Sequence, residues 1–148
     1  MKITDTIGTV LKHKESREIL AIAPDQSVHE ALEKMSRHNV GALLVLNSGK
    51  LVGIFSERDL VRLLAQDGPG AMQRPLQAVM THNVVTCRAE DRIDDILRLM
   101  TINKVRHVPV TEAGRLAGIV SIGDLVNHRL TEKQQEAEVL LEISRMRA

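Results

Sequence analysis

A direct repeat constrains this sequence more than any other feature. Residues 53–61, which read GIFSERDLV, recur at residues 118–126 as GIVSIGDLV, an offset of 65 positions. The same offset aligns further apolar and glycine positions, pairing Leu32 with Leu97, Met35 with Met100, Val40 with Val105, Val45 with Val110, Gly49 with Gly114 and Leu51 with Leu116. Because one register holds from position 32 to position 61 without a gap, the chain is interpreted as two copies of one structural unit.

Each copy is predicted to begin with a strand and a helix. The apolar runs 19–23 and 84–87 indicate the strand of each copy. Apolar residues at i, i+3, i+4 and i+7 from Val28 and from Ile93 indicate the helix that follows. A capping box over residues 27–30 marks the start of the first of these helices, and Asp91 marks the start of the second.

A hairpin and a closing helix complete each copy. The apolar runs 42–46 and 51–55 flank residues 47–50, Asn-Ser-Gly-Lys, which are typical of a hairpin turn. Residues 111–114 take that place in the second copy. The closing helices are predicted to begin at Ser56 and Ser121, so each copy is β-α-β-β-α and the fold class is α/β (α+β).

Three regions are expected along the chain. Residues 1–67 would hold a short N-terminal helix and the first repeat, residues 68–130 the second repeat, and residues 131–148 a C-terminal helix, with the repeats joined at the glycine- and proline-containing stretch 66–70. The N-terminal helix is expected within residues 2–12, with Ile3, Ile7, Val10 and Leu11 on one face. The apolar positions of the C-terminal helix, Val139, Leu140, Ile143 and Met146, suit packing either on its own domain or on a second chain.

Composition excludes several classes of protein. The 20 basic and 19 acidic residues nearly balance over 148 positions, and Phe55 is the only aromatic residue of the Phe, Tyr and Trp type, which argues against nucleic-acid binding. With Cys87 as the only cysteine, the chain cannot form an internal disulfide or a thiolate metal cluster. No apolar run is long enough to span a membrane, and the first residues lack the pattern of a secretory signal, so the cytoplasm is the expected compartment.

The repeated Ser-x-x-Asp sequence has two interpretations, both of which stay open at this point. The serine hydroxyl and the aspartate suit a capping box at the start of a helix. Free N–H groups at a helix start also favour a phosphate, and a nearby carboxylate can bind a ribose diol. The glycines that precede the motifs, Gly53 and Gly118, would let a ligand approach the backbone closely.

The two copies differ most in the strand before the hairpin turn. The second copy has Arg106 and His107 ahead of Val108-Pro109-Val110, where the first has Gly41 and Ala42, and Leu44 stands in place of Pro109. The basic pair could protect a solvated strand edge, or it could contact a phosphate.

Two β-α-β-β-α copies that each end in Gly-apolar-apolar-Ser-x-x-Asp, with an apolar-Pro-Val strand in the second, resemble a tandem pair of CBS domains, often called a Bateman module. The resemblance covers about residues 7–130 and is strongest to small stand-alone bacterial CBS-pair proteins, through residues 41–45, 56–60 and 106–110. It implies that the two sheets pack about a pseudo-twofold axis and leave clefts for adenosine-containing ligands.

The resemblance also implies a role for individual residues. Asp59 and Asp124 would hold ribose hydroxyls, with Ser56 and Ser121 beside the ribose and phosphate. Adenine would lie among apolar residues and backbone of the first strand and of the apolar-Pro-Val strand, and the basic residues would contact phosphates. The nucleotide-binding residues expected are Ile22, Ala23, Ser56, Arg58, Asp59, Thr86, Arg106, His107, Val108, Pro109, Ser121 and Asp124.

The function expected from this resemblance is a non-catalytic sensor of adenine nucleotides. The chain has no P-loop or GxGxxG sequence, no HExxH and no catalytic constellation, so no catalytic or metal-binding residue is expected. The ligands expected are AMP in one cleft and NAD or NADH in the other, with ATP, ADP and S-adenosylmethionine as alternatives. A homodimer is the expected assembly, with an unidentified effector protein as a further partner. The alternatives are a homodimerisation module with empty clefts and a nucleotide-processing enzyme.

Overall fold

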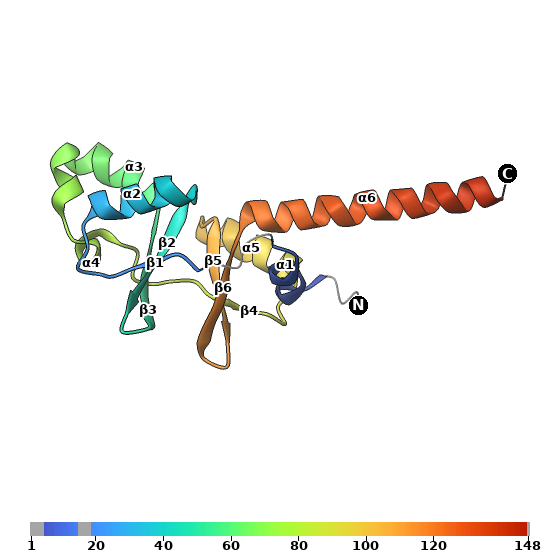
Figure 1. The fold of residues 1–148 in the computed structure, drawn as a ribbon, viewed down its shortest axis with the longest axis horizontal. Helices are drawn as coiled ribbons and strands as arrows, with labels where there is room; N and C mark the ends of the chain where they lie inside the picture. The colour runs from blue at the N-terminus through green and yellow to red at the C-terminus, as the bar shows by residue number, and fades with distance from the viewer. Residues whose placement is uncertain (1–4, 15–18, 148) are drawn as a thin grey trace. The chain divides into compact units, whose positions relative to one another are not determined.

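The computed structural model describes residues 5–14 and 19–147, and these form two compact units (Figure 1). One unit is Glu18–Thr86, and the other joins Met1–Arg17 to Cys87–Ala148. Each unit contains one three-stranded sheet and one copy of the repeat. No helix among the described residues is long and apolar enough to cross a membrane.

The Glu18–Thr86 unit contains the first repeat. Its elements are β1 (Ala21–Ile22), α2 (Val28–His38), β2 (Ala42–Asn47), β3 (Lys50–Ser56), α3 (Glu57–Asp67), the 3-10 helix η2 (Pro69–Gln73) and α4 (Leu76–Val79). The sheet order is β1-β2-β3, with β1 parallel and β3 antiparallel to β2. Ser48 and Gly49 both have positive φ (51° and 81°), as the predicted tight hairpin turn requires.

The core of this unit lies between the sheet and its helices. Alternate residues of β2 and β3, Leu43, Val45 and Phe55, are fully buried and belong to the same cluster as Val28 and Met35 of α2. The spacing of Val28, Ala31 and Met35 turns one face of α2 towards this cluster, as the sequence predicts.

The other unit contains the second repeat together with the N-terminal helix. Its elements are α1 (Ile7–His13), β4 (Cys87–Arg88), α5 (Ile93–Asn103), β5 (His107–Glu112), β6 (Arg115–Ser121) and α6 (Ile122–Met146). The sheet order β4-β5-β6 and the register repeat those of the first sheet, since Ile22 opposite Val45 corresponds to Cys87 opposite Val110. The two β-α-β-β-α repeats expected from the sequence are therefore confirmed.

The division into units differs from the expected regions 1–67, 68–130 and 131–148. Helix α1 packs with the second repeat: Ile7 is fully buried in its core, and the Ile7 N–H donates to the Asp91 carbonyl at 2.9 Å. Helix α4 packs with the first repeat, where Ile54 and Thr81 exchange two backbone hydrogen bonds at 3.0 Å. Each unit thus includes a segment that was expected in the region of the other repeat: α1 reaches the second repeat through contacts distant in sequence, and α4 stays with the repeat that precedes it along the chain.

Local boundaries also depart from the sequence prediction. The first strands are Ala21–Ile22 and Cys87–Arg88, shorter than the apolar runs that indicated them. Asp91 does not cap α5, because its Oδ2 accepts from the Arg88 N–H at 2.8 Å, and α5 begins after Arg92 without a side-chain cap. The N-terminal helix covers Ile7–His13, and Ile3 lies outside the described residues.

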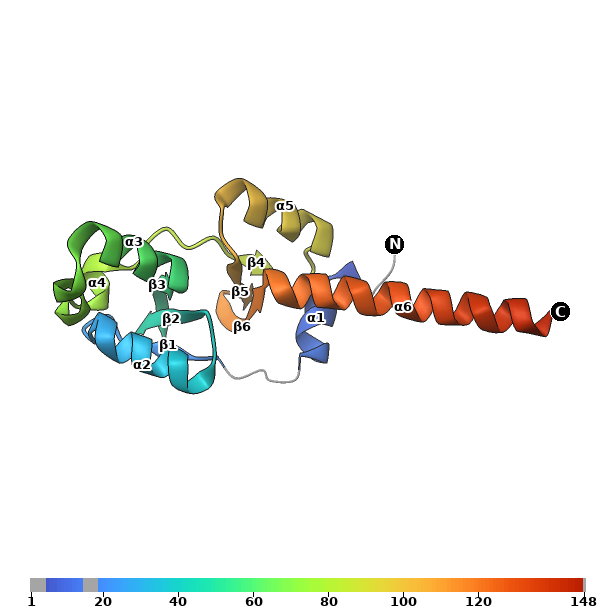
Figure 2. The ribbon, with the colours of Figure 1, turned by 90° about the horizontal axis from the view of Figure 1, so that it is seen from above.

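The closing helix of the second repeat and the expected C-terminal helix are one continuous element. Helix α6 runs for 25 residues from Ile122 to Met146. It contains no proline, and its only glycine, Gly123, lies in the first turn, so nothing in the sequence interrupts it. In both views of the unit, α6 extends past α1 and α5, and no other described element lies beside its second half (Figures 1 and 2).

Candidate functional site

The Ser-x-x-Asp motif of the first repeat forms a capping box at the start of α3. The Ser56 Oγ accepts from the Asp59 N–H at 3.3 Å, and the Asp59 Oδ2 accepts from the Ser56 N–H at 2.8 Å and from its hydroxyl at 3.0 Å. The other carboxylate oxygen, Oδ1, accepts from the Thr81 hydroxyl at 3.1 Å. Both oxygens of Asp59 therefore receive hydrogen bonds from neutral donors.

The second motif forms the same capping box at the start of α6. The Ser121 N–H donates to the Asp124 Oδ2 at 2.8 Å, and the Asp124 N–H donates to the Ser121 Oγ at 3.0 Å. Here the Asp124 Oδ2 also lies 3.0 Å from the Lys14 Nζ, which donates to the Ile119 carbonyl at 2.8 Å. The side chains of Lys14 and Asp124 are only 22% and 26% exposed, so this ion pair is partly shielded from water.

The helix-cap interpretation of both motifs is confirmed. The N–H of the first helical residue is also satisfied within each unit, since Glu57 donates to the Gly41 carbonyl at 3.0 Å and Ile122 to the Arg106 carbonyl at 2.8 Å. A cap does not prevent ligand binding, because a carboxylate oxygen can accept more than one hydrogen bond. The two motifs share their backbone geometry and differ in the side chain that contacts the aspartate.

The glycines ahead of the motifs make room for neighbouring side chains. A Cβ on Gly53 would lie 2.9 Å from both Cγ and Cε of Met80, and one on Gly118 would lie 2.9 Å from a terminal methyl of Leu11. Met80 follows α4 and Leu11 belongs to α1, the two segments that pack in a different unit from the region in which the sequence places them. Close approach at these glycines is therefore explained by packing, where the sequence suggested a ligand.

The basic pair of the second repeat lies close to the start of α6. His107 begins β5 and is directly opposite Ser121 in the β5–β6 register, where the first repeat pairs Ala42 with Ser56. Arg106 is exposed, and its carbonyl reaches the first turn of α6. Val108 and Pro109 are buried in the same strand. The unit thus gathers the basic pair and the Ser-x-x-Asp motif at one end of its hairpin.

The first repeat arranges its expected residues differently. Ile22 is buried opposite Val45, and the Ala23 N–H donates to the Gln26 Oε1 at 3.0 Å. Arg58 is exposed in the first turn of α3. Of the residues expected from the sequence, this unit carries Ile22, Ala23, Ser56, Arg58, Asp59 and Thr86, and the other unit carries Arg106, His107, Val108, Pro109, Ser121 and Asp124.

Two residues at these motifs were missed by the sequence interpretation. Thr81 and Lys14 contact the aspartates from segments 22 and 110 positions away along the chain. Neither residue belongs to a recognisable motif. Under the 65-residue offset Thr81 corresponds to Ser16, which lies outside the described residues, and Lys14 corresponds to Val79, so the repeat gives no signal for the lysine.

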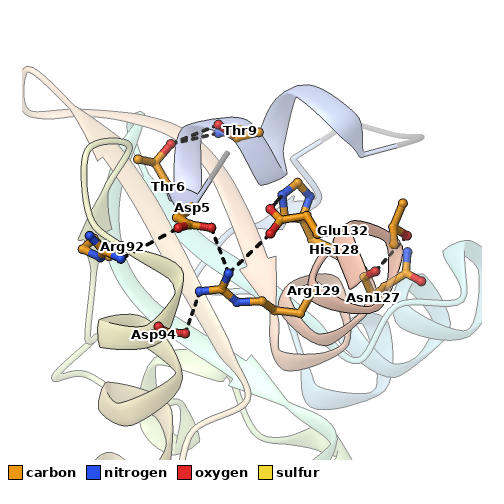
Figure 3. A network of polar contacts seen from close by, with 10 residues as sticks. Asp5, Thr6, Thr9, Arg92, Asp94, Asn127, His128, Arg129 and Glu132 are labelled. Carbon is orange, nitrogen blue, oxygen red and sulfur yellow. Dashed lines mark hydrogen bonds and ion pairs between the residues drawn. The ribbon is translucent and has the colours of Figure 1, made fainter. Parts of the chain in front are cut away.

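A polar network that the sequence did not indicate surrounds the second turn of α6 (Figure 3). The Arg129 guanidinium lies 2.9 Å from an oxygen of Asp5, 2.7 Å from Asp94 and 3.4 Å from Glu132. Burial opposes the charge of Arg129, but the hydrogen bonds and charges of Asp94 and Asp5 outweigh it and raise the pKa of Arg129. Because Asp5 precedes α1 and Asp94 belongs to α5, this network attaches α6 to both helices.

No reactive constellation lies in the part of the chain that the structure describes. His128 is 2.8 Å from Glu132 and stacks on the ring of His13 at 5.7 Å, and no group of three potential metal ligands occurs among the described residues. Burial, followed by the charge of Asp91, raises the pKa of the Cys87 thiol to about 12. A thiol that holds its proton at neutral pH is a poor nucleophile.

Comparison with known proteins identifies the repeat. Residues 8–66 and 76–131 each match the model of the CBS domain. The chain is 34% identical over 143 residues to the CBS domain-containing protein CBSX3, mitochondrial, of Arabidopsis thaliana, and this match covers 91% of this chain and 69% of that protein. It is 31% identical over 124 residues to the CBS domain-containing protein YhcV of Bacillus subtilis, and this match covers 83% of this chain and 87% of that protein.

Solved structures share the fold. A CBS-domain containing protein from Agrobacterium tumefaciens has 40% sequence identity and a TM-score of 0.81, covering 84% of this chain and 98% of its own. The CBS domain pair of protein MJ0100 has 27% sequence identity and a TM-score of 0.73, and the match covers 87% of this chain and 97% of that pair. That pair was solved in complex with 5′-methylthioadenosine and S-adenosyl-L-methionine.

Proposed function

The chain belongs to the CBS-domain family as a tandem pair of repeats, and on this premise we propose that it is a non-catalytic regulatory module that binds adenosine-containing ligands. The observation that carries the proposal is the likeness to a CBS pair solved with two adenosyl compounds, together with a Ser-x-x-Asp motif in both units. Both motifs present a half-buried carboxylate at the start of a helix, which suits a ribose diol.

The proposed contacts follow from the chemistry of each side chain. Asp59 and Asp124 accept from ribose hydroxyls, in place of or beside the present donors Thr81 and Lys14. Ser56 and Ser121 lie beside the ribose and phosphate. The basic side chains of Arg58, Arg106 and His107 bind the phosphates. Adenine lies against apolar residues and backbone, at Ile22, Ala23, Thr86, Val108 and Pro109.

Signal transmission is part of the proposal. The residues expected to contact ligand come from both repeats, so the affinity for ligand would depend on how the repeats are arranged. A ligand then shifts the population of arrangements by as much as its affinity differs between them. A homodimer and an unidentified effector protein are the proposed partners, and the cytoplasm is the proposed compartment.

We propose different ligands for the two motifs, namely AMP at one and NAD or NADH at the other. Asp124 faces the ammonium group of Lys14, whereas Asp59 faces the hydroxyl of Thr81. The basic pair Arg106-His107 adjoins the Asp124 motif, and the neutral Gly41-Ala42 occupies that position at Asp59. The surroundings of Asp124 are therefore more positive than those of Asp59, so the two motifs are not expected to bind the same ligand equally well.

Thermal melting with AMP, ADP, ATP, NAD, NADH and S-adenosylmethionine tests this function. A ligand at 100 times its Kd should add about 2.7 kcal/mol to the stability of the folded chain. We expect two different adenylates to raise the Tm, with Asp59→Asn and Asp124→Asn each removing mainly one response. Asparagine keeps an oxygen that can accept the serine N–H, so the helix cap is retained. Two identical, independent AMP sites would contradict the assignment of different ligands.

One alternative has a specific observation in its favour. Both Ser-x-x-Asp motifs make complete capping boxes, which would account for their presence without any ligand. The chain would then be a homodimerisation module. A melting temperature unchanged by every adenylate, at concentrations up to several millimolar, would support this alternative over the sensor.

A further inference from the structure

The second half of α6 carries an exposed apolar stripe, formed by Val139, Leu140, Ile143 and Met146. These side chains are 55%, 66%, 41% and 84% exposed. They recur at i, i+1, i+4 and i+7, so they share one face of the helix. Every residue from 133 to 147 is exposed, which means that this half of the helix packs against no other described element of its own unit.

An isolated helix segment of this length is only marginally stable in water, and most helices in proteins are stabilised by packing an apolar face. The first turns of α6 have such packing, because Leu125 is fully buried and Arg129 is held by Asp5 and Asp94. The apolar stripe has none. A partner that covers it would therefore remove apolar surface from water and stabilise the helix.

The charges at the ends of the apolar stripe indicate what that partner is. Glu136 lies one turn before Leu140, and Arg147 lies one turn after Ile143 on the same line of the helix. Eleven residues, or roughly 16 Å of helix, separate the acid from the base. A stripe with an acid at one end and a base at the other is complementary to itself when one copy is reversed.

We propose that the apolar stripe pairs with the same stripe of a second copy of the chain, with the two α6 helices antiparallel. A twofold axis near residue 141 brings Val139 opposite Ile143 of the partner subunit. The same axis brings Glu136 of each copy close to Arg147 of the other. A parallel pair would instead place Glu136 against Glu136 and Arg147 against Arg147, which is unfavourable at both ends.

Other occupants fit the apolar stripe less well. Helices that lie on membrane surfaces carry a basic polar face, whereas residues 131–147 contain four acids and three bases. An unrelated protein would not explain why the end charges match a reversed copy of the same stripe. The inference rests on the proposed homodimer and assigns its contact surface, and it does not depend on adenylate binding.

The contact is small. Stable protein interfaces bury about 1,200–2,000 Å² in total, and two facing stripes of four side chains fall at or below the low end of this range. We therefore expect a dimer that dissociates on dilution. Because α6 is held to α1 and α5 by the Arg129 network, pairing of the apolar stripes would fix the position of each second-repeat unit relative to its partner.

Light scattering over a range of concentrations gives the first test. The wild-type chain should rise from 16.4 kDa towards twice that mass as concentration increases. Leu140→Gln with Ile143→Gln should remain at the monomer mass. Leu141→Gln is the matched control, because Leu141 is 57% exposed but lies roughly 160° around the helix from Ile143. A wild-type chain that stays monomeric, or a control that changes the mass as much as the stripe variant, overturns the proposal.

Disulfide cross-linking tests the orientation. Glu136→Cys and Arg147→Cys should each fail to cross-link alone, whereas a mixture of the two variants should form a covalent heterodimer under mild oxidation. Self-linking of Glu136→Cys would show a parallel pair and overturn the proposal. The native thiol gives little background, because Cys87 is buried and its pKa is about 12. Adenylate melting of the monomeric Leu140→Gln, Ile143→Gln variant separates the two proposals, since it should keep its ligand response.

Discussion

Replacing Gly53 with alanine should destabilise the Glu18–Thr86 unit by about 1–3 kcal/mol, the usual range for overpacking a core. The new Cβ would lie 2.9 Å from both Cγ and Cε of Met80. Met80 is 7% exposed and packs in the same cluster as Phe55 and Leu76, so it has little room to move away. At ~2–4 °C per kcal/mol, the Tm should fall by roughly 2–12 °C.

The equivalent change in the second repeat is a matched control. A Cβ on Gly118 would meet one methyl of Leu11 at 2.9 Å and the other at 3.5 Å. Leu11 is only half-buried, so its side chain can turn aside more easily than Met80. We expect Gly118→Ala to cost less than Gly53→Ala, below about 1 kcal/mol.

A double-mutant cycle attributes the cost to the contact. Met80→Ala alone should cost about 2–5 kcal/mol through the cavity it leaves. In that background Gly53→Ala should be nearly neutral, which gives a coupling of about 1–3 kcal/mol between the two positions. Urea unfolding of the four proteins measures each value. Additive effects would refute the packing explanation, and so would a Gly53→Ala protein that keeps its full stability and loses only adenylate binding.

Three further perturbations test other parts of the structure. Ala113 has a φ of 50° in its hairpin turn, so Ala113→Asn should raise stability by about 1 kcal/mol in thermal melting, and the same change at Ser48 (φ 51°) should act in the same direction. Arg129→Gln leaves Asp5, which is 7% exposed, without its 2.9 Å partner and should cost about 2 kcal/mol in urea unfolding. Folding raises the pKa of the Cys87 thiol from 9.0 to about 12. Because the unfolded chain loses this proton at a lower pH, the stability of the folded chain should fall as the pH rises from 9 towards 12. At pH 8, iodoacetamide should label Cys87 only after unfolding, and rapid labelling of the folded chain would contradict its burial.

The repeat and its hairpins could be predicted because their signals are local. The expected runs 42–46 and 51–55 became β2 and β3 with one further residue at one or both ends. The register of both sheets, including an irregularity at Val45/Leu46 and at Val110/Thr111, follows the 65-residue offset. Turn residues and alternating burial determine these features within a few positions of the chain.

The placement of α1 and α4 could not be predicted from local signals. Both are short, and α1 contacts a repeat that is distant along the chain through Leu11, whereas α4 lies between the two repeats in the sequence and contacts the one before it next to Met80. The continuity of α6, by contrast, has a local signal, because no glycine or proline lies between Gly123 and the expected C-terminal helix.

The candidate site was predictable in its serines and aspartates and not in their partners. Ser56, Asp59, Ser121 and Asp124 stand in a motif whose helix-capping geometry follows from spacing alone. The groups that make the two aspartates different arrive from elsewhere in each unit, an ammonium in one and a hydroxyl in the other. Only the folded chain shows this difference in charge.

A direct binding titration tests the central claim most closely. Calorimetry of the purified chain with each adenylate that raises its Tm should show binding that Asp59→Asn or Asp124→Asn weakens about 10- to 100-fold, as expected for losing a hydrogen bond to a charged group worth about 1.5–3 kcal/mol. Ser27→Ala serves as the control, because it removes the serine cap of α2, which accepts from the Glu30 N–H at 3.1 Å, and leaves both carboxylates in place. Binding that both asparagine variants retain in full, or no binding of any adenylate by the wild-type chain, would contradict the assignment of the two aspartates as the ribose-binding groups of a nucleotide sensor.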